Sequence, residues 1–283
     1  MTDGRGRVVR AAPAKLNLFL EVLGRRPDGY HEIDSVFCAL DLHDTVTVEK
    51  SDAISLSIDG ADDVPADETN LAWRAAEAFG AGARIHLQKR IPAGAGLGGG
   101  SSDAAAVLLA LAEIHGADPA ALGDRAVGLG ADVPYFLRAG LARGRGIGER
   151  VEPVAAPPAG SFLLLLPDLF CSTKEIYGAL EPGLTGCNDG ATVFLERYLE
   201  AGGGAHAPYF NRLQAAAEQV VPQLRMVRED AERRFGLPFT MTGSGSSYFA
   251  WVGADPGNTP ASWTVENVAV RVVLVRSAPT DST

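Results

Sequence analysis

Residues 91–106 read IPAGAGLGGGSSDAAA, a run of small residues between two regular patterns. Before it, apolar and polar residues alternate over 83–91, which is the period-two pattern of a half-buried strand. After it, apolar residues recur at helical spacing over 107–114. The stretch is therefore predicted to be a strand, a glycine loop and the beginning of a helix.

The glycine loop has the composition of a phosphate-binding turn. Glycine adopts backbone conformations that other residues avoid, and it lets a ligand approach the main chain closely. Ser101 or Ser102 is the predicted N-cap of the following helix, whose first N–H groups have no intrahelical partner. Such N–H groups converge on one point, where an anion is favoured. A flexible turn without a ligand is the alternative, but the flanking strand and the cap favour phosphate.

Two well-known phosphate motifs do not fit this loop. Gly94, Gly96 and Gly99 satisfy the dinucleotide pattern G-x-G-x-x-G, but that pattern follows a strand buried on both faces, whereas 83–91 alternates. The acidic residue expected about 20 positions later, at the end of a second apolar strand, is also missing. No G-x-x-x-x-G-K-[ST] sequence occurs. A phosphate loop of another kind remains, beside a sheet with one exposed face.

Composition describes an acidic globular chain. Of its 283 residues, 46% are hydrophobic and 21% charged, and this length can bury the cores of two domains. The net charge of −10 argues against a nucleic-acid partner. Cys38, Cys171 and Cys187 are far apart in the sequence, which predicts free thiols in a reducing compartment. With no signal sequence or long apolar run, we expect a cytoplasmic protein without a membrane segment. The scattered histidines predict no structural metal.

The patterns along the chain predict an α+β protein of two domains with antiparallel sheets. In the first half they indicate an early strand over 11–24, a turn at 25–32, strands within 35–50, and a helix within 68–83 that Gly80 ends. A helix near 119–130 and a basic glycine-rich turn over 142–154 follow. The second half is predicted to contain a buried strand at 161–170, a helix over 191–204, a long amphipathic helix over 211–236 that Pro222 interrupts or kinks, and strands within 239–253 and at 268–276. The Pro-rich stretch 153–160 is the predicted boundary between domains 1–153 and 154–283.

The first strand and a later turn carry candidate catalytic groups. Strict alternation predicts two faces for this strand, with Leu16, Leu18 and Leu20 on one and Lys15, Asn17 and Phe19 on the other. A lysine there is usually only exposed, and Asp132, near Gly130 and Pro134, could be only a turn former or helix cap. If folding brings Lys15 and Asp132 together beside the glycine loop, the aspartate can accept a proton from a substrate hydroxyl. The lysine would then keep the carboxylate ionised and stabilise developing negative charge.

Five stretches of the chain, from about residue 9 to 252, resemble a known family. The segments 13–20 (PAKLNLFL), 92–106 and 241–250 (MTGSGSSYFA) resemble, in order and spacing, the three motifs of the GHMP small-molecule kinases. The segments 25–37 (RRPDGYHEIDSVF) and 129–137 (LGADVPYFL) resemble the branch that acts on 4-diphosphocytidyl-2-C-methyl-D-erythritol. The resemblance implies a two-domain fold with an N-terminal nucleotide-binding α/β domain, built on a mixed or antiparallel sheet, and a ferredoxin-like α+β C-terminal domain.

The resemblance also implies a reaction and its residues. ATP, with Mg²⁺, would phosphorylate the 2-hydroxyl of the cytidyl substrate in non-mevalonate isoprenoid biosynthesis, with Asp132 as general base and Lys15 assisting. Ser101 or Ser102 would lie near the metal ion, and the resemblance assigns Ser102 as the residue that contacts the Mg²⁺ bound to ATP. The nucleotide would contact Pro92, Gly94, Gly96, Leu97, Gly98, Gly99, Gly100, Ser101 and Ser102, with Asn70 on the adenine side.

On the acceptor side, the resemblance places the cytosine at Tyr30 and His31, with Tyr177 as a second aromatic. Asn17 would touch the substrate, and Gly243, Ser244 and Gly245 would approach the methylerythritol or its diphosphate. From the residues alone, an aromatic in a Pro-Asp-Gly turn is expected to be exposed and to need a ligand or partner, although Tyr30 could also pack on its own domain. The second glycine turn could likewise be only a wide hairpin.

Two other functions stay open from the sequence. The same chemistry could act on mevalonate, homoserine or a sugar, or the chain could be a non-catalytic nucleotide- or RNA-binding protein. The acidic charge and the presence of both Lys15 and Asp132 argue against the second. Two segments depart from the family: 253–268 is rich in Pro, Gly and Asn where a helix is usual, and 178–208 has no clear correspondence.

Overall fold

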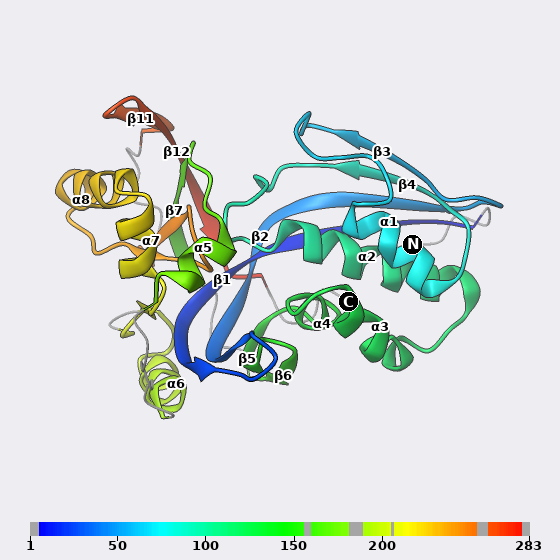
Figure 1. Cartoon of the computed structure of the whole chain (residues 1–283), viewed down its shortest axis with the longest axis horizontal. Coiled ribbons are helices and arrows are strands. Elements are labelled where there is room, and N and C mark those ends of the chain that lie inside the picture. Colours follow the sequence, from blue (N-terminus) through cyan, green and yellow to red (C-terminus); the bar gives the residue numbers. More distant parts are fainter. Residues whose placement is uncertain (1–5, 156–159, 181–188, 205–206, 254–259, 279–283) are drawn as a thin grey trace.

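Two long strands form the axis of the molecule. The computed structural model describes residues 6–155, 160–180, 189–204, 207–253 and 260–278. β1 (Arg7–Arg25) and β2 (His31–Lys50) pair antiparallel along nearly their whole lengths (Figure 1). The predicted turn joins them, and in it the amide of Gly29, at φ +90°, donates to the carbonyl of Arg26.

The first sheet is mixed and has seven strands. Its order is β3-β4-β2-β1-β8, and β5 and β6 extend it beside the first half of β2. The pairs β3–β4 and β1–β8 are parallel, and the others are antiparallel. The additional strands are β3 (Ser55–Asp59), β4 (Ala83–Gln88), β5 (Leu141–Gly146), β6 (Arg150–Pro153) and β8 (Phe210–Asn211).

Helices of the first half cover one face of this sheet (Figure 1). They are α1 (Leu71–Phe79), α2 (Gly99–His115), a 3₁₀ turn (Pro119–Leu122), α3 (Gly123–Leu129) and α4 (Val133–Phe136). As predicted, α1 ends at Gly80, whose left-handed φ of +84° lets its amide cap the last carbonyls. The central helix, α2, has ten buried residues, and five of them are alanine, which lets the helix pack closely.

The second sheet is antiparallel and has five strands in the order β11-β12-β7-β10-β9. Its members are β7 (Ser161–Pro167), β9 (Thr240–Met241), β10 (Tyr248–Trp251), β11 (Ser262–Val265) and β12 (Val268–Arg276). The helices of this half are α5 (Thr173–Gly178), α6 (Gly190–Glu200), α7 (Gln214–Val220) and α8 (Gln223–Phe235). Pro222 separates α7 from α8, as predicted. The two-sheet α+β architecture confirms the predicted fold class.

One local prediction was wrong, and two strands, β3 and β11, had no prediction. The basic segment 142–154 is no loose turn but the hairpin β5–β6, because Arg143 forms a bidentate ion pair with the buried Asp34. The strand β3 had no prediction, although Leu56 and Ile58 alternate with polar residues. Before the last strand the chain forms β11, and the tight turn at Glu266 and Asn267, both at positive φ, returns it into β12.

The faces of β1 also differ from strict alternation. Leu16 and Leu18 pack in an interior cluster, but Phe19 joins them there. Leu20, by contrast, turns toward the cavity that Lys15 and Asn17 line. The reason is a register irregularity between Asn17 and Phe19, which shifts Phe19 and Leu20 to the opposite faces. The predicted grouping of Leu20 with Leu16 and Leu18 was therefore wrong.

Two of the three apolar clusters of the described residues join the two halves of the chain. One combines Leu16 and Leu18 with Phe162, Leu164 and Phe249. The other likewise contains buried residues of both halves. The strand β8, from the second half, also completes the first sheet beside β1. The halves therefore share a core, while the division at residues 153 and 154 stays a prediction.

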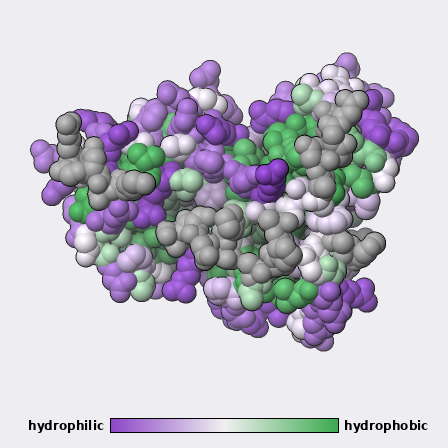
Figure 2. Space-filling model, turned by 180° about the vertical axis from the view of Figure 1, so that it is seen from behind, coloured by the Kyte–Doolittle hydropathy of each residue, from purple (hydrophilic) through white to green (hydrophobic). Residues whose placement is uncertain are grey.

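The outer surface is mixed in character. Seen from behind, hydrophilic side chains cover much of both ends, and apolar ones appear at several separate places (Figure 2). Within the described residues, no helix is both long and apolar enough to cross a membrane. Cys38 and Cys171 are buried and form no disulfide, as the sequence predicted for them, whereas Cys187 lies outside the described residues.

Candidate active site

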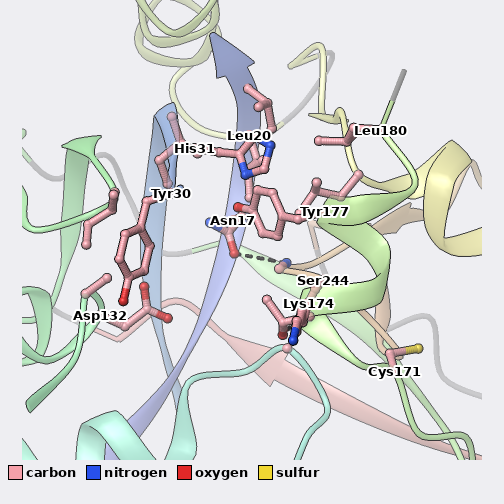
Figure 3. Close-up of a pocket in the computed structure, with 18 of the residues that line it drawn as sticks. Asn17, Leu20, Tyr30, His31, Asp132, Cys171, Lys174, Tyr177, Leu180 and Ser244 are labelled. Carbon is pink, nitrogen blue, oxygen red and sulfur yellow. Dashed lines mark hydrogen bonds between the residues drawn. The ribbon is translucent and has the colours of Figure 1, made fainter. Parts of the chain in front are cut away.

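A cavity of about 1280 Å³ opens between the two halves of the molecule. Its walls come from β1, the β1–β2 turn, the glycine loop before α2, the segment before α4, α5 and the second glycine turn. In Figure 3, Tyr30 and Asp132 lie on one side, His31 and Tyr177 form the middle, and Lys174 and Ser244 lie on the other side. Segments that are far apart in the sequence thus line one cavity.

Lys15 and Asp132 meet in this cavity. The Nζ atom of Lys15 lies 3.7 Å from Oδ2 of Asp132. The lysine is only 4% exposed, and burial lowers its pKa, while the charge of Asp132 opposes that shift. Asp132 stands at the N-cap position of α4 but makes no capping hydrogen bond, so its carboxylate stays directed to the cavity. The structure therefore brings together the two groups that the sequence singled out.

Asn17 connects Lys15 to the second glycine turn. Its Oδ1 accepts from Lys15 Nζ at 2.6 Å and from the amide of Gly243 at 3.0 Å, the latter drawn dashed in Figure 3. Its Nδ2 donates to the hydroxyl of Ser35 at 2.8 Å, and its own amide donates to Thr242 Oγ1 at 2.9 Å. Asn17 borders the cavity, as expected for a substrate contact, but most of its hydrogen-bonding capacity aligns Lys15 with the turn.

The two glycine turns pack backbone against backbone. A Cβ on Gly96 would lie 2.3 Å from the carbonyl oxygen of Thr242, and one on Gly243 would lie 2.8 Å from that of Gly96. Both residues also have positive φ, at +75° and +57°. The amide of Ser247 donates to the carbonyl of Ala95, and that of Lys15 donates to the carbonyl of Leu97. The first glycine loop is therefore hydrogen-bonded both to β1 and to the segment after the second glycine turn. Glycine is required at these two positions because the two backbones approach each other closely, and not only because a ligand must reach the main chain.

The helix after the loop begins earlier than predicted. Its N-cap is Gly98, in the left-handed region at φ +74°, and no side chain caps it. The prediction of Ser101 or Ser102 as N-cap was therefore wrong, because the chain already has helical geometry from Gly99. Ser101 faces the cavities. Ser102 is 1% exposed, and its Oγ has no hydrogen-bond partner among the described residues.

A second cavity of about 330 Å³ adjoins the glycine loop on its other side. The predicted nucleotide residues that line it are Asn70, Pro92, Gly94, Gly96, Leu97, Gly98, Gly99, Gly100 and Ser101. The side chain of Asn70 caps α1, because its Oδ1 accepts from the amide of Ala72 at 2.9 Å and its Nδ2 donates to the carbonyl of Pro65. A contact between Asn70 and adenine stays a prediction.

Aromatic side chains line part of the large cavity. The rings of His31 and Tyr177 are 4.9 Å apart and inclined by 31°. Tyr30, which is 61% exposed, stands apart from this pair (Figure 3). Burial and the nearby Arg25 lower the pKa of His31, so its ring is mostly neutral at pH 7. Three rings thus border a space in which a flat heterocycle could stack.

Two further residues of the cavity wall, Phe170 and Lys174, were not predicted from the sequence. Phe170 is 78% exposed, and its ring would lie 3.5 Å from a Cβ on Gly94. Lys174, in the first turn of α5, adds a positive charge near Ser244, whose hydroxyl is hydrogen-bonded to Thr173 at 2.7 Å. An exposed aromatic in a loop with a lysine four positions later has no distinctive pattern, so only the fold reveals their position.

The chain is similar in sequence to known proteins. Residues 70–140 match the family model of the GHMP kinases N terminal domain. The 4-diphosphocytidyl-2-C-methyl-D-erythritol kinase of Thermus thermophilus is 44% identical over 248 residues, covering 85% of this chain and 86% of that protein. The kinase of the same name from Pelotomaculum thermopropionicum is 40% identical over 254 residues, covering 86% of this chain and 88% of that protein.

The chain is also similar to solved structures. A crystal structure of 4-(cytidine 5'-diphospho)-2C-methyl-D-erythritol kinase superposes with a TM-score of 0.72 at 42% identity, over 87% of this chain and 90% of that one. The homoserine kinase of Cytophaga hutchinsonii superposes with a TM-score of 0.65 at 19% identity, over 98% of this chain and 96% of that one, which shows a shared fold alone.

Proposed function

Because the chain belongs to the 4-diphosphocytidyl-2-C-methyl-D-erythritol kinases of the GHMP family, we propose that Lys15 and Asp132 catalyse transfer of the γ-phosphoryl group of ATP to the acceptor's 2-hydroxyl. The chain is an ATP-dependent kinase of the non-mevalonate isoprenoid pathway. The observation that carries the assignment of these two residues is the 3.7 Å separation of their charged groups beside the glycine loop.

Asp132 acts as the general base. Its carboxylate makes no capping bond and is partly solvated, so it is available to accept the hydroxyl proton as the O–P bond forms. Lys15 stabilises the ionised carboxylate and the charge that develops on the transferring group. Its burial strengthens both effects, because water screens the charges less. Asn17 holds the ammonium from the other side.

The glycine loop binds the triphosphate. Its main-chain amides and those of the first turn of α2 are unpaired donors at the positive end of a helix. The adjoining cavity beside Asn70 and Pro92 would hold the nucleoside. A Mg²⁺ ion bound mainly by the phosphates fits the hard oxygen donors of Asp132 and Ser101 that face the cavity, whereas the buried Ser102 would have to reorient to reach it. When bound, this ion neutralises phosphate charge.

The acceptor occupies the large cavity. Its cytosine would stack among Tyr30, His31 and Tyr177, and its diphosphate would lie near the amides of Gly243 to Gly245 and the ammonium of Lys174. The methylerythritol hydroxyl then reaches Asp132. The net charge of −10 and the buried thiols of Cys38 and Cys171 support a cytoplasmic protein without nucleic-acid partners.

The test compares acceptors with purified protein, ATP and Mg²⁺. We expect ADP release and a phosphorylated product with the cytidyl acceptor, and at least ~10²-fold lower kcat/KM with mevalonate, homoserine or galactose, since these leave the aromatic end of the cavity empty. Equal turnover of any non-cytidyl acceptor would contradict the proposed substrate. Turnover of none, with nucleotide still bound, would contradict the proposed catalysis.

A further inference from the structure

Phe170 borders the large cavity and has the most exposed large apolar side chain among the described residues. Its exposed fraction is 78%, and that of Tyr30, the next in order, is 61%. Removing an aromatic ring from water is favourable, so a ring exposed at a cavity wall gains free energy when a ligand covers it. The catalytic scheme above assigns Phe170 no role.

The backbone on both sides of Phe170 is held in place. Before it, the amide of Asp168 donates to the carbonyl of Ala269 in β12 at 2.8 Å. After it, the hydroxyl of Thr173 is hydrogen-bonded to that of Ser244 at 2.7 Å. The ring is therefore carried by a segment that is fastened to the second sheet and to the second glycine turn. Its exposure is set by the fold.

The ring faces one end of an edge that the two cavities share. The residues that line both cavities are Gly94, Gly96, Gly98 and Ser101. Phe170 faces the first of them, because a Cβ on Gly94 would lie 3.5 Å from Cδ2 of its ring. Lys15 lies nearer the other end, where a Cβ on Gly98 would be 3.2 Å from its Cγ atom. A phosphoryl group that passes from the nucleotide to the acceptor crosses this shared edge.

Water competes with the acceptor at this edge. Asp132 is partly exposed, so its carboxylate can also accept a proton from water. In that side reaction the water oxygen bonds to the γ-phosphorus, the bond to the β–γ bridging oxygen breaks, and ADP and phosphate leave. Phe170 lines the large cavity and not the smaller one. The ligand that covers its ring is therefore expected to be the acceptor and not the nucleotide.

We propose that Phe170 is a specificity-determining residue that favours the acceptor over water in phosphoryl transfer. This inference rests on the proposed function, because it takes the ligand of the large cavity to be the phosphoryl acceptor. The bound acceptor covers the ring, and together they exclude water from the Gly94 end of the shared edge. The 2-hydroxyl oxygen then bonds to the γ-phosphorus, its proton passes to Asp132, and ADP leaves.

Hydroxyl-radical footprinting of the wild type, read by mass spectrometry, tests whether the ring is covered. The probes are a non-hydrolysable ATP analogue alone, and the analogue together with the cytidyl acceptor. We expect oxidation of Phe170 to fall several-fold with both ligands and to stay near the free-protein value with the analogue alone. Leu199 is the internal control, because it is exposed on α6 and lines neither cavity.

The variant Phe170→Ala tests the consequence for the reaction. Because the side chain is so exposed, its removal is expected to leave the fold intact, which thermal unfolding checks. With saturating ATP, Mg²⁺ and acceptor, we expect equal amounts of ADP and phosphorylated product from the wild type. Phe170→Ala should release several-fold more inorganic phosphate per product, with KM for ATP unchanged. This excess should require the acceptor, because without it the ring is exposed to water in either case.

Phe170→Tyr keeps the ring and should restore the ratio of phosphate to product, and Leu199→Ala is the matched control. An equal ratio in Phe170→Ala and the wild type would overturn the proposal, as would an excess of hydrolysis that is just as large without acceptor. Unchanged oxidation of Phe170 in a wild type that phosphorylates the acceptor would overturn this inference and leave the proposed function intact. Protection of the ring by the acceptor, in a protein that transfers no phosphoryl group, would confirm the covering of Phe170 and contradict the proposed function.

Discussion

The ammonium of Lys15 is buried and has two polar neighbours. Its Nζ atom lies 3.7 Å from Oδ2 of Asp132 and donates to Oδ1 of Asn17 at 2.6 Å. The identities of these residues were predictable, because they lie in recognisable motifs. Their burial was not, because it depends on Thr242 and Gly243, more than two hundred positions later.

The buried position of Lys15 predicts an alkaline limit of activity. Because burial lowers the pKa of Lys15, the ammonium is lost at a lower pH than the ordinary value of 10.5. We expect kcat to fall as the pH rises toward that value, and Lys15→Arg, which stays protonated, to lose this limb of the profile even if its activity is lower. Lys15→Met should reduce kcat by ~10² or more at every pH. A Lys15→Arg profile with an unchanged alkaline limb contradicts this assignment.

Stacking by Tyr177 predicts a selective loss of acceptor binding. Tyr177→Ala should raise KM for the cytidyl acceptor about tenfold or more, since stacking of a base on an aromatic ring contributes ~1–3 kcal/mol. Tyr177→Phe keeps the ring and serves as the control, with a KM close to wild type. KM for ATP should change in neither variant. Steady-state kinetics with both substrates varied would reveal the opposite pattern if the rings bind the nucleotide instead.

At the scale of elements, the order of strand, loop and helix around residues 91–106 followed from the sequence, and the structure confirms it. The predictions that were wrong concern local details that depend on contacts with other segments of the chain. The helix begins at Gly99 and not at a serine cap, because Gly98 can adopt a left-handed conformation against Phe136 and Lys15. The irregularity in β1 that turns Leu20 to the cavity likewise has no signature in alternating hydrophobicity.

The contact between the two glycine turns predicts contrasting effects of two alanine substitutions. Gly96→Ala places a Cβ 2.3 Å from the carbonyl of Thr242 at a φ of +75°, so it should destabilise the fold by at least ~1–2 kcal/mol and raise KM for ATP at least tenfold. Gly100→Ala is the control within the same motif. Its nearest neighbour would be Leu71 Cδ1 at 3.7 Å, and its position is helical.

We therefore expect Gly100→Ala to retain KM for ATP and to stabilise the protein by up to ~1 kcal/mol. Thermal unfolding and ATP kinetics of the two variants, measured in parallel, provide the check. Similar losses of nucleotide affinity in both variants would contradict this explanation. They would mean that the loop tolerates no side chain at any position, and that the contact of Gly96 with the second glycine turn is not what makes glycine necessary there.

For the whole molecule, the sequence predicted two sheets but not how they share a core. Apolar runs at 161–170 and 11–24 indicate buried strands without indicating which strand packs on which. In the structure, Leu164 of β7 packs with Leu16 and Leu18 of β1. The active-site cavity lies where the two halves meet, so its geometry could not follow from either half alone.

This shared core predicts cooperative unfolding. Leu164→Ala should lower the free energy of unfolding by about 2–5 kcal/mol, as for other buried leucines. Because the cluster spans both halves, Trp73 of α1 and Trp251 of β10 should report the same shifted transition. Single-tryptophan variants followed by fluorescence in denaturant test this. Two separate transitions, with only the Trp251 signal shifted, would show that the halves unfold independently.

The most direct test of the whole account is the rate of phosphoryl transfer from ATP to the cytidyl acceptor in Asp132→Asn, measured in a single turnover with saturating substrates. Asparagine keeps the shape of the side chain but cannot take the hydroxyl proton. We predict a rate reduced by ~10²-fold or more, with binding of the ATP analogue nearly unchanged. The matched control Asp124→Asn, at an exposed carboxylate in the first turn of α3, should be as active as the wild type. A wild-type transfer rate in Asp132→Asn would contradict the account.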